Sequence, residues 1–363
     1  MRVLIVGGGI GGLAAAIALR RAGMQPIVFE RAPELREVGA GLTLWPNAIK
    51  ALRKIGCAES IEKTATRLVR SESRTWNGKL LAELDLAALA ARVGAPTFGI
   101  HRADLQHLLA DATGPGVLRL GMTCTAFTQG PHGVTIRFAN GEQEKGDLLV
   151  GADGLRSSVR PLVVGSQKPR YAGYTAWRGV ADVEATDVPD GTAVVAAGRG
   201  SQAGFLPLGH GRTYWFATVN VGENEMLMGS TRAVLARRFA DWYAPIPALI
   251  SATDETAIVR TDIYDRKPAT AWGVGRVTLL GDAAHPTTPN LGQGACQALE
   301  DAAVLARCLA ERPADPATAL RDYEAARMPR TADVVNRSWE IGRWLAVESR
   351  VANFVRDWGM RLG

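Results

Sequence analysis

The chain opens with a short apolar run that passes directly into a glycine-rich segment and then into an alanine-rich, helix-forming stretch. Residues 3–6 are apolar and mostly β-branched, which is typical of a parallel strand buried on both faces. The helical stretch ends near Gly23, and residues 26–30 form a second apolar run that ends in Glu30. This order of strand, turn, helix and strand predicts a βαβ unit.

The same buried-strand pattern returns later in the chain, separated by helical spacing and by a long β-rich segment. Apolar runs predict strands at residues 117–120, 134–138, 147–150 and 277–280, and helical spacing predicts helices near residues 48–55, 100–110 and 295–310. Residues 66–82 alternate around Asn77-Gly78, which predicts a β-hairpin. Residues 171–266 have mainly strand patterns, with one predicted helix near residues 232–243. We therefore expect an α/β fold interleaved with a β-rich second domain.

Composition and charge narrow the class of protein. A chain of 363 residues, 47% hydrophobic and 21% charged, is ordinary for a globular protein with two domains. No apolar run is long enough to span a membrane, so the cytoplasm is the expected compartment. The net charge of +6 comes without a basic run interleaved with aromatics, which argues against nucleic-acid binding. We expect the scattered cysteines to be small buried hydrophobes rather than metal ligands or disulfides: Cys57, Cys124, Cys296 and Cys308.

The glycine segment carries the first chemical signal. Gly7, Gly9 and Gly12 have the G-x-G-x-x-G spacing, in which the glycines permit a tight turn, approach to a pyrophosphate and close helix packing. Glu30 follows 18 residues after Gly12, where an acceptor for a ribose hydroxyl is needed. A secretory signal peptide is the alternative, but the glycines would interrupt its apolar core. The spacing indicates a dinucleotide and leaves NAD and FAD both open.

Further glycine turns follow later buried strands. Asp153-Gly154 opens the segment at residues 151–160, a second candidate phosphate or ribose site. Gly281-Asp282 follows the strand at residues 277–280 and leads into a proline- and glycine-rich loop. The polar loop at residues 31–41 also contains glycines, which suggests backbone close to a ligand, although an ordinary turn remains an alternative.

Taken in order, the three signatures resemble the group A flavoprotein monooxygenases, which are single-component aromatic hydroxylases. The similarity extends to about Arg330, and it is greatest to the branch with salicylate hydroxylase, FAD-dependent urate hydroxylase and zeaxanthin epoxidase. The motifs that suggest this branch are Leu44-Trp-Pro-Asn47, Tyr171-Ala-Gly-Tyr174, Tyr264-Asp-Arg-Lys-Pro268 and Pro289-Asn-Leu-Gly-Gln-Gly294. The resemblance implies a three-layer, Rossmann-like FAD-binding domain at residues 1–66, 98–168 and 268–330. It implies a β-rich substrate domain at residues 67–97 and 169–267, with a helical tail at residues 331–363.

The resemblance also implies roles for the cofactor residues. Glu30 would bind the adenosine ribose, Arg102 the phosphate or ribityl region, and Asp282 the ribityl chain. The backbone of Pro289, Gly292, Gln293 and Gly294 would face the pyrimidine edge of the flavin, where negative charge gathers on reduction. Pro289, Gly292 and Gly294 are accordingly the catalytic candidates. The full set of expected cofactor residues also includes Gly7, Gly9, Gly11, Gly12, Arg31 and Asp153.

The implied reaction is that of an FAD-dependent monooxygenase. NADH or NADPH reduces FAD, oxygen adds to give a flavin C4a-hydroperoxide, and one oxygen atom is transferred to a small electron-rich aromatic or unsaturated substrate by hydroxylation or epoxidation. The candidates for substrate contact are Tyr174, Arg178, Gln202, Phe205 and Tyr214, although half of any strand faces away from a pocket. Gln202 stands where urate hydroxylase has an arginine, and Arg199 lies three residues earlier, so urate is a doubtful substrate.

Other readings remain open. A flavin-dependent halogenase is disfavoured because the chain has no Trp-x-Trp-x-Ile stretch. A flavoprotein oxidase or dehydrogenase would keep every motif, as would a protein that binds FAD or a metabolite without turnover. No metal site is expected, and the chain is expected to be a monomer or a homodimer. We expect His285 to shape the flavin site and His210 to lie in a turn. The apolar residues of the tail, including Trp344, Val351, Phe354 and Trp358, are expected to pack on the body rather than on a membrane.

Overall fold

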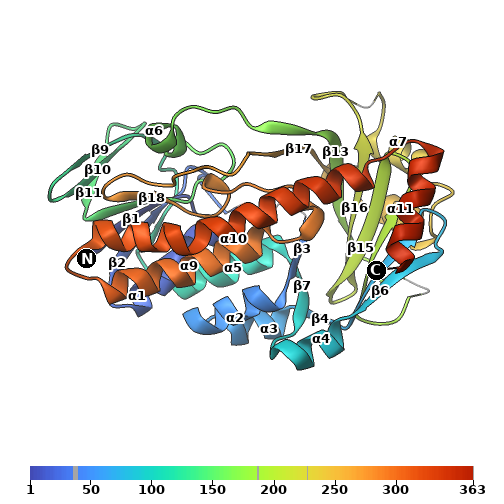
Figure 1. The fold of residues 1–363 in the computed structure, drawn as a ribbon, viewed down its shortest axis with the longest axis horizontal. Coiled ribbons are helices and arrows are strands. Elements are labelled where there is room, and N and C mark those ends of the chain that lie inside the picture. Colours follow the sequence, from blue (N-terminus) through green and yellow to red (C-terminus); the bar gives the residue numbers. More distant parts are fainter. Residues whose placement is uncertain (36–39, 186–187, 227, 363) are drawn as a thin grey trace.

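The computed structural model describes residues 1–35, 40–185, 188–226 and 228–362 (Figure 1). The loop predicted at residues 31–41 therefore lies partly outside the described residues.

A five-stranded parallel sheet forms the centre of the half of the molecule that is expected to bind the cofactor. Its strands are β18 (Val277–Leu279), β12 (Leu148–Gly151), β1 (Arg2–Val6), β2 (Gln25–Phe29) and β8 (Leu118–Arg119), in that order. Every neighbouring pair runs parallel. The residues Val3, Leu4 and Ile5 are fully buried, as the continuous apolar run predicts.

Two further layers cover this sheet, and together they confirm the predicted three-layer α/β architecture (Figure 1). On one face α1 (Ile10–Arg21) packs against α9 (Gly294–Glu311) and α5 (Arg102–Thr113). On the other face lies an antiparallel sheet of β9 (Cys124–Gly130), β10 (Gly133–Phe138) and β11 (Gln143–Gly146). The rings of Phe29 and Phe138 meet across the two sheets, with centroids 4.8 Å apart. Helix α1 is buried along most of its length because it lies between the sheet and two helices.

The second half is built around a seven-stranded sheet with the order β17-β13-β16-β15-β14-β5-β6. Its strands are β17 (Val259–Asp265), β13 (Arg170–Ala181), β16 (Arg212–Asn220), β15 (Ser201–Gly209), β14 (Thr192–Ala197), β5 (Arg70–Thr75) and β6 (Leu80–Asp85). Helices α7 (Thr231–Arg238) and α8 (Pro245–Ala252) cover one face, and their apolar side chains share a core with that face. A small sheet of β3 (Gly41–Leu44), β7 (Thr97–His101) and β4 (Thr66–Leu68) lies between the halves, where β7 contacts β15.

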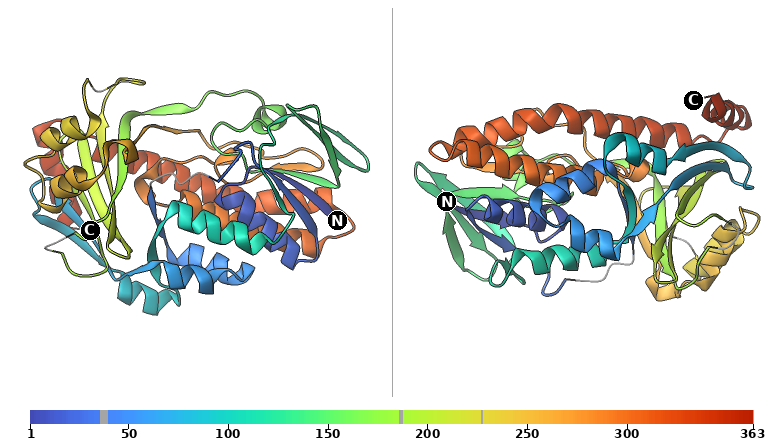
Figure 2. Two further views of the ribbon diagram at one scale, coloured as in Figure 1. Left: turned by 180° about the vertical axis from the view of Figure 1, so that it is seen from behind. Right: turned by 90° about the horizontal axis from the view of Figure 1, so that it is seen from below.

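Two long C-terminal elements join the halves along one side of the molecule (Figure 2). Helix α10 (Pro316–Leu345) packs against α9 and then continues toward the seven-stranded sheet, where α11 (Arg350–Leu362) follows. Asp315 caps α10, since its side chain accepts a hydrogen bond from the Thr318 amide at 3.2 Å. The helix runs across residue 330, where the sequence places a domain boundary, and that division of the chain stays a prediction.

The structure refines several predicted elements. The Asn77-Gly78 hairpin is formed by β5 and β6, whereas residues 66–68 form β4 in a different sheet. The predicted helix at residues 232–243 ends at Arg238. His210 has a φ of 54° between β15 and β16, which confirms the predicted turn. All four cysteines are buried and free. The remaining helices are α2 (Pro46–Ile55), α3 (Ala58–Thr64), α4 (Leu86–Val93) and α6 (Arg160–Val164).

Candidate active site

The glycine turn between β1 and α1 brings three chain segments into contact. Gly7 has a φ of +112°, and a Cβ there would lie 2.3 Å from the Ala152 carbonyl oxygen. A Cβ at Gly12 would lie 1.9 Å from the Gly7 carbonyl oxygen, so neither position can hold a side chain. A Cβ at Gly9 would meet nothing within 4 Å. The turn therefore leaves open space beside the start of α1, where no side chain caps the helix amides. This arrangement fits a pyrophosphate.

Glu30 lies directly beside that turn. Its Oε2 accepts a hydrogen bond from the Gly8 amide at 2.7 Å, and its Oε1 accepts one from the Ala32 amide at 2.9 Å. Gln106 on α5 donates to the Gly8 carbonyl at 2.8 Å and holds the other side of the turn. The carboxylate is thus fixed at the tip of β2, where a ribose would need an acceptor. The neighbouring Arg31 is exposed, and Gly11 on α1 faces Leu280.

Asp282 occupies a 3-10 turn (Gly281–Ala283) after β18. The residue is exposed to solvent, yet desolvation by the surrounding protein raises the pKa of Asp282. The charges of the nearby His285 and Arg102 lower that pKa in part. This combination of solvent access and partial desolvation is expected of a side chain that lines a ligand site. Arg102 and Asp282 come from segments 180 residues apart, and the fold places them together.

The proline- and glycine-rich loop at residues 289–294 ends at the start of α9. Gly292 has a φ of +61°, and Gln293 makes no side-chain cap to the helix. A Cβ at Gly294 would lie 3.8 Å from Oδ1 of Asp282, so the uncapped helix start is adjacent to that carboxylate. Pro289 and Gly292 are both exposed. The loop, Asp282 and Arg102 therefore border one region.

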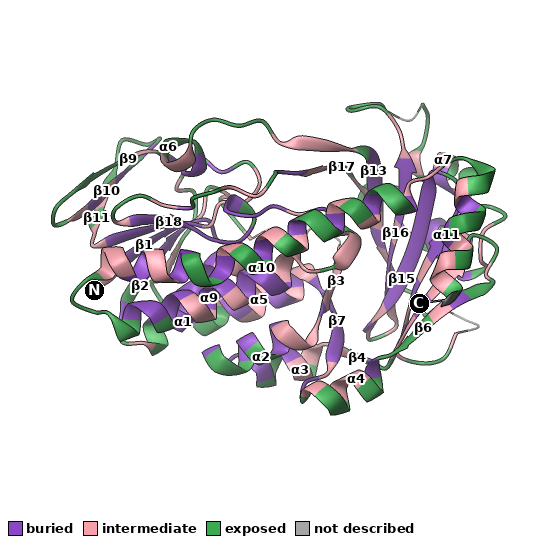
Figure 3. Ribbon diagram, viewed as in Figure 1, coloured by how far each residue is buried: buried purple, intermediate pink, exposed green. Residues whose placement is uncertain are grey.

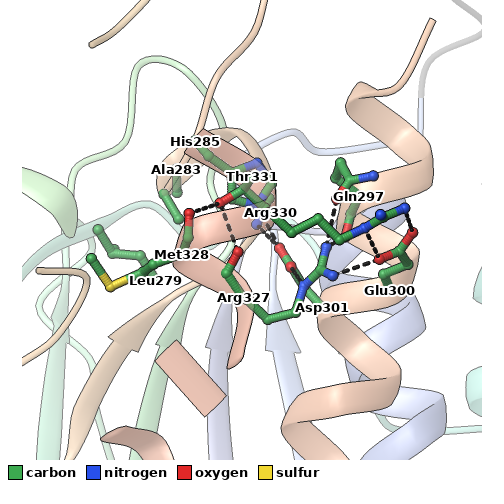
Figure 4. A network of polar contacts seen from close by, with 12 residues as sticks. Leu279, Ala283, His285, Gln297, Glu300, Asp301, Arg327, Met328, Arg330 and Thr331 are labelled. Carbon is green, nitrogen blue, oxygen red and sulfur yellow. Dashed lines mark hydrogen bonds and ion pairs between the residues drawn. The ribbon is translucent and has the colours of Figure 1, made fainter. Parts of the chain in front are cut away.

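A buried ionic network holds this region in place (Figure 4). Asp301 on α9 is fully buried and accepts hydrogen bonds from the Gly281 amide at 3.0 Å and from Arg327 Nε at 2.6 Å. Its Oδ2 also lies 2.6 Å from His285 Nε2. Burial favours the neutral acid, but His285 and Arg327 outweigh it and hold the pKa of Asp301 below its ordinary value. Because Asp301 binds both ends of the turn that carries Asp282, it fixes the position of that turn.

Asp153 has a mainly local set of contacts. Its carboxylate accepts hydrogen bonds from Ser157 Oγ at 2.5 Å and from the Ser158 amide at 2.6 Å, so it organises the turn before α6. Arg160 follows this turn and donates through Nη1 to the carbonyls of Ala283 and Ala284, both at 2.8 Å. The second glycine turn therefore supports the backbone that follows Asp282.

Four of the five candidates for substrate contact lie on one face of the seven-stranded sheet. Strand register places Tyr174, Arg178, Gln202 and Tyr214 on the face opposite α7 and α8. Asn290 of the loop donates to the Tyr174 hydroxyl at 3.0 Å, so this face meets the cofactor half. Burial raises the pKa of Tyr174 to about 12 and also raises that of Tyr214, and the Arg178 cation between them opposes both shifts. Among the described residues, no carboxylate forms an ion pair with Arg178.

Phe205 does not lie with the other four candidates. It belongs to the alternate set of β15 side chains and is buried in the core beneath α7 and α8, where its ring stacks on Tyr243 with centroids 6.3 Å apart. The sequence-based expectation that Phe205 faces the substrate is corrected by this register. Arg199, the arginine three residues before Gln202, donates to the Glu348 carbonyl at 2.8 Å, in the C-terminal tail.

Three side chains at this site have no role that the sequence predicts. Gln106 braces the glycine turn, and Asn290 joins the loop to Tyr174. Trp45 has a buried indole N–H without a partner among the described residues, and this nitrogen would lie 3.1 Å from a Cβ at Gly292. Only Trp45 and Asn290 carry a signal in the sequence, since both lie in the motifs that suggest the flavoprotein branch.

Two surface cavities lie near this half of the molecule. One of about 300 Å³ is lined in part by Trp45, Gln293 and Arg330, and it borders the loop. A larger cavity of about 380 Å³ is lined by Arg20, Cys57 and neighbours, away from Asp282. The larger cavity contains none of the candidate residues, so convergent side chains, rather than cavity size, identify the site.

Comparisons with known proteins agree with this geometry. A family model described as FAD binding domain matches residues 1–338. Aurachin C monooxygenase/isomerase from Stigmatella aurantiaca is 45% identical over 100% of this chain and 94% of its own. The 3-amino-4-hydroxybenzoate 2-monooxygenase from Streptomyces cremeus is 39% identical over 93% of this chain and 86% of its own. Klebsiella pneumoniae HpxO complexed with FAD and uric acid has a TM-score of 0.93 at 34% identity, covering 100% of this chain and 93% of its own.

In the part of the chain that the structure describes, no helix combines the length and apolar character needed to cross a bilayer.

Proposed function

The chain belongs to the family described as FAD binding domain, and from this premise we propose how it holds FAD and what kind of substrate it oxygenates. It is an enzyme, an FAD-dependent monooxygenase that uses NADH or NADPH as reductant. When bound, FAD accepts a hydride from the nicotinamide and passes the electrons to dioxygen. The remaining tasks belong to the protein's own residues, which bind, orient and exclude water.

The described residues fit FAD as a single extended ligand. The space beside Gly9 and the uncapped amides of α1 would receive the pyrophosphate, and Glu30 the adenosine ribose. Asp282 would accept a hydrogen bond from a ribityl hydroxyl, with Arg102 beside it. The start of α9 would face the pyrimidine edge, where its free amides and helix dipole stabilise negative charge.

The substrate side is the sheet face that bears Tyr174, Arg178, Gln202 and Tyr214. The observation that carries the proposal is the Asn290–Tyr174 hydrogen bond, which connects the flavin-facing loop directly to that face. Aromatic side chains on two strands suit a flat ring, and an arginine without a carboxylate partner suits an acidic or anionic oxygen on that ring. We therefore propose an electron-rich aromatic substrate with such an oxygen. Gln202 and the outward course of Arg199 favour a substrate other than urate.

The decisive experiment measures substrate-dependent turnover with labelled dioxygen. The purified enzyme is offered phenols, aromatic acids, quinolones and polyenes, while NAD(P)H oxidation and transfer of label to product are followed. A phenolic or acidic aromatic that accelerates NAD(P)H oxidation and acquires one labelled oxygen supports the proposal. Hydrogen peroxide without labelled product would indicate an oxidase, and absence of NAD(P)H turnover would indicate a binding protein. Since NAD(P)H is the reductant, we place the enzyme in the cytoplasm.

A further inference from the structure

Helix α11 lies at the surface and carries both buried and exposed residues (Figure 3). Its most buried side chains are polar, and its most exposed ones include large apolar residues. The outward set, called the α11 stripe below, is Val351, Phe354, Val355 and Trp358, which are 73%, 72%, 56% and 57% exposed. By contrast, Asn353 is 8% exposed and Arg356 is 1% exposed. This polarity is the reverse of the one that burial of apolar surface favours. The expectation that Val351, Phe354 and Trp358 pack on the body is therefore wrong.

Hydrogen bonds on the inner side fix this orientation. Arg356 donates through Nη1 to the Gly198 carbonyl at 2.8 Å and through Nη2 to the Ala197 carbonyl at 3.4 Å. Asn353 donates to the carbonyls of Val347 and Ser349, both at 2.9 Å. Turning the helix to bury its apolar side would leave the guanidinium without its acceptors on the sheet. The α11 stripe is therefore presented to whatever lies outside the molecule.

The α11 stripe has the spacing of a helix-pairing seam. Its residues follow the order i, i+3, i+4 and i+7, which is one heptad of a two-helix contact. Trp344 of α10 is 42% exposed and extends the patch, because its ring lies 3.6 Å from a Cβ placed at Gly359. The match to the family model ends at residue 338, so the patch lies outside the matched part of the chain.

We propose that the α11 stripe is the contact surface of a homodimer, in which two copies of α11 pack antiparallel across a two-fold axis. The stripe is symmetric about the midpoint between Phe354 and Val355. Antiparallel pairing about that point sets Val351 against the partner's Trp358 and Phe354 against the partner's Val355, a small side chain against a large one in each case. A two-fold contact needs this kind of self-complementarity.

A membrane surface fits the patch less well than a second copy. The exposed charges that flank the α11 stripe are of both signs, Glu348 against Arg350 and Arg361. Helices that lie on membranes keep a cationic face in the headgroup region, whereas the polar face of α11 is turned into the protein. The helix is roughly 20 Å long, so the interface is modest and the dimer should dissociate on dilution.

Sedimentation velocity on the full-length, FAD-bound protein tests this over a range of concentrations. We expect a reversible monomer–dimer equilibrium. Phe354→Asp should raise the dissociation constant by about 30-fold or more, because it removes a central aromatic contact and places a charge there. The matched control is Met226→Asp, which alters a side chain that is 69% exposed elsewhere and should leave the equilibrium unchanged. Both variants should keep bound FAD and NAD(P)H oxidation.

Single cysteines test the register. The four native cysteines are buried, so an introduced surface thiol can be oxidised selectively. Val355→Cys should form a disulfide-linked dimer, because the two copies of this residue face each other near the axis. Val351→Cys should not, because its two copies would be about 10 Å apart along the helices. A wild-type protein that stays monomeric up to its solubility limit overturns the proposal. So does cross-linking only through residue 351, or binding to phosphatidylglycerol vesicles by a protein that is monomeric in solution.

Discussion

At the scale of single residues, two carboxylates at the site have different surroundings. Glu30 already accepts hydrogen bonds from two backbone amides, whereas desolvation by the surrounding protein raises the pKa of Asp282. Both side chains are proposed acceptors for hydroxyl groups of FAD. Their difference predicts that Glu30 also stabilises the empty glycine turn, while Asp282 gains its main partner only when FAD binds.

Glu30→Ala and Asp282→Ala should each weaken FAD binding by about 1–3 kcal/mol, since a buried hydroxyl loses a charged acceptor. Quenching of flavin fluorescence on titration of the apoprotein measures the affinity. Glu311→Ala, which alters a surface pair at 3.8 Å, is the control and should have no effect. Wild-type affinity in both variants would show that the cofactor is misplaced.

Arg178→Ala should raise KM for an acidic aromatic substrate by about 10- to 100-fold, the usual effect of losing a hydrogen bond to a charged group. FAD affinity should stay unchanged, because Arg178 belongs to the sheet rather than to the glycine turn. Steady-state NAD(P)H oxidation gives KM, and Arg199→Ala is the matched control because Arg199 contacts the tail. An equal loss in both variants would contradict the assigned role.

At the scale of elements, the structure separates two glycines that the sequence treats alike. Gly292 needs its positive φ, so any substitution there strains the turn. A Cβ at Gly294 would meet Thr287 at an ordinary 3.7 Å. Gly294→Val should therefore fold normally and uncouple the reaction, with NAD(P)H consumed, hydrogen peroxide formed and less product. Thermal unfolding and the ratio of product to NAD(P)H measure the two effects. Full coupling in Gly294→Val would make the loop merely structural.

The network around Asp301 predicts an acid-dependent effect on stability. A carboxylate with a lowered pKa stabilises the fold fully above its unfolded value of about 3.9, and the contribution is lost as pH falls through the lower folded value. Asp301→Asn should cost about 3–5 kcal/mol near pH 7, because it leaves Arg327 and His285 facing a neutral partner. Denaturant unfolding followed from pH 7 down to about pH 2 should show the penalty shrinking only below about pH 4. A penalty that stays the same across this range would exclude this linkage.

The sequence predicted those features that depend on close backbone approach. Gly7 and Gly12 have no room for a Cβ, so these positions require glycine, and the requirement is visible in the sequence as the glycine spacing. Strand register has no such signal in the sequence. The sequence therefore does not distinguish Gln202 from Phe205, although they lie on opposite faces of the sheet. Asp301 was missed because its partners come from α10 and from the turn after β18. The inverted polarity of α11 depends on carbonyl acceptors in β14 and the residue that follows it, which helix periodicity cannot reveal.

At the scale of the whole molecule, FAD would join segments that are distant along the chain. In the proposed binding mode the glycine turn, Glu30, Arg102 and the start of α9 would all contact the same FAD, which would hold these segments together. We expect a yellow protein with one noncovalently bound FAD, released by acid precipitation. Compared with the protein in free FAD at 100 times its Kd, the apoprotein should have a free energy of unfolding lower by about 2.7 kcal/mol. Calorimetry of apoprotein and holoprotein measures this, and flavin retained in the acid pellet would contradict it.

The order of the strands in the five-stranded sheet also bears on how the chain is made. Strand β1 pairs with β12, which begins more than 140 residues later, and β12 pairs with the edge strand β18, which begins more than 270 residues after β1. During synthesis β1 therefore stays unpaired on its β12 side until β12 has left the ribosome. Helix α1 lacks its neighbour α9 for longer still. Pairings of such long range form slowly and leave apolar edges open in the meantime. The nascent protein should thus depend on chaperones until nearly its whole length has emerged.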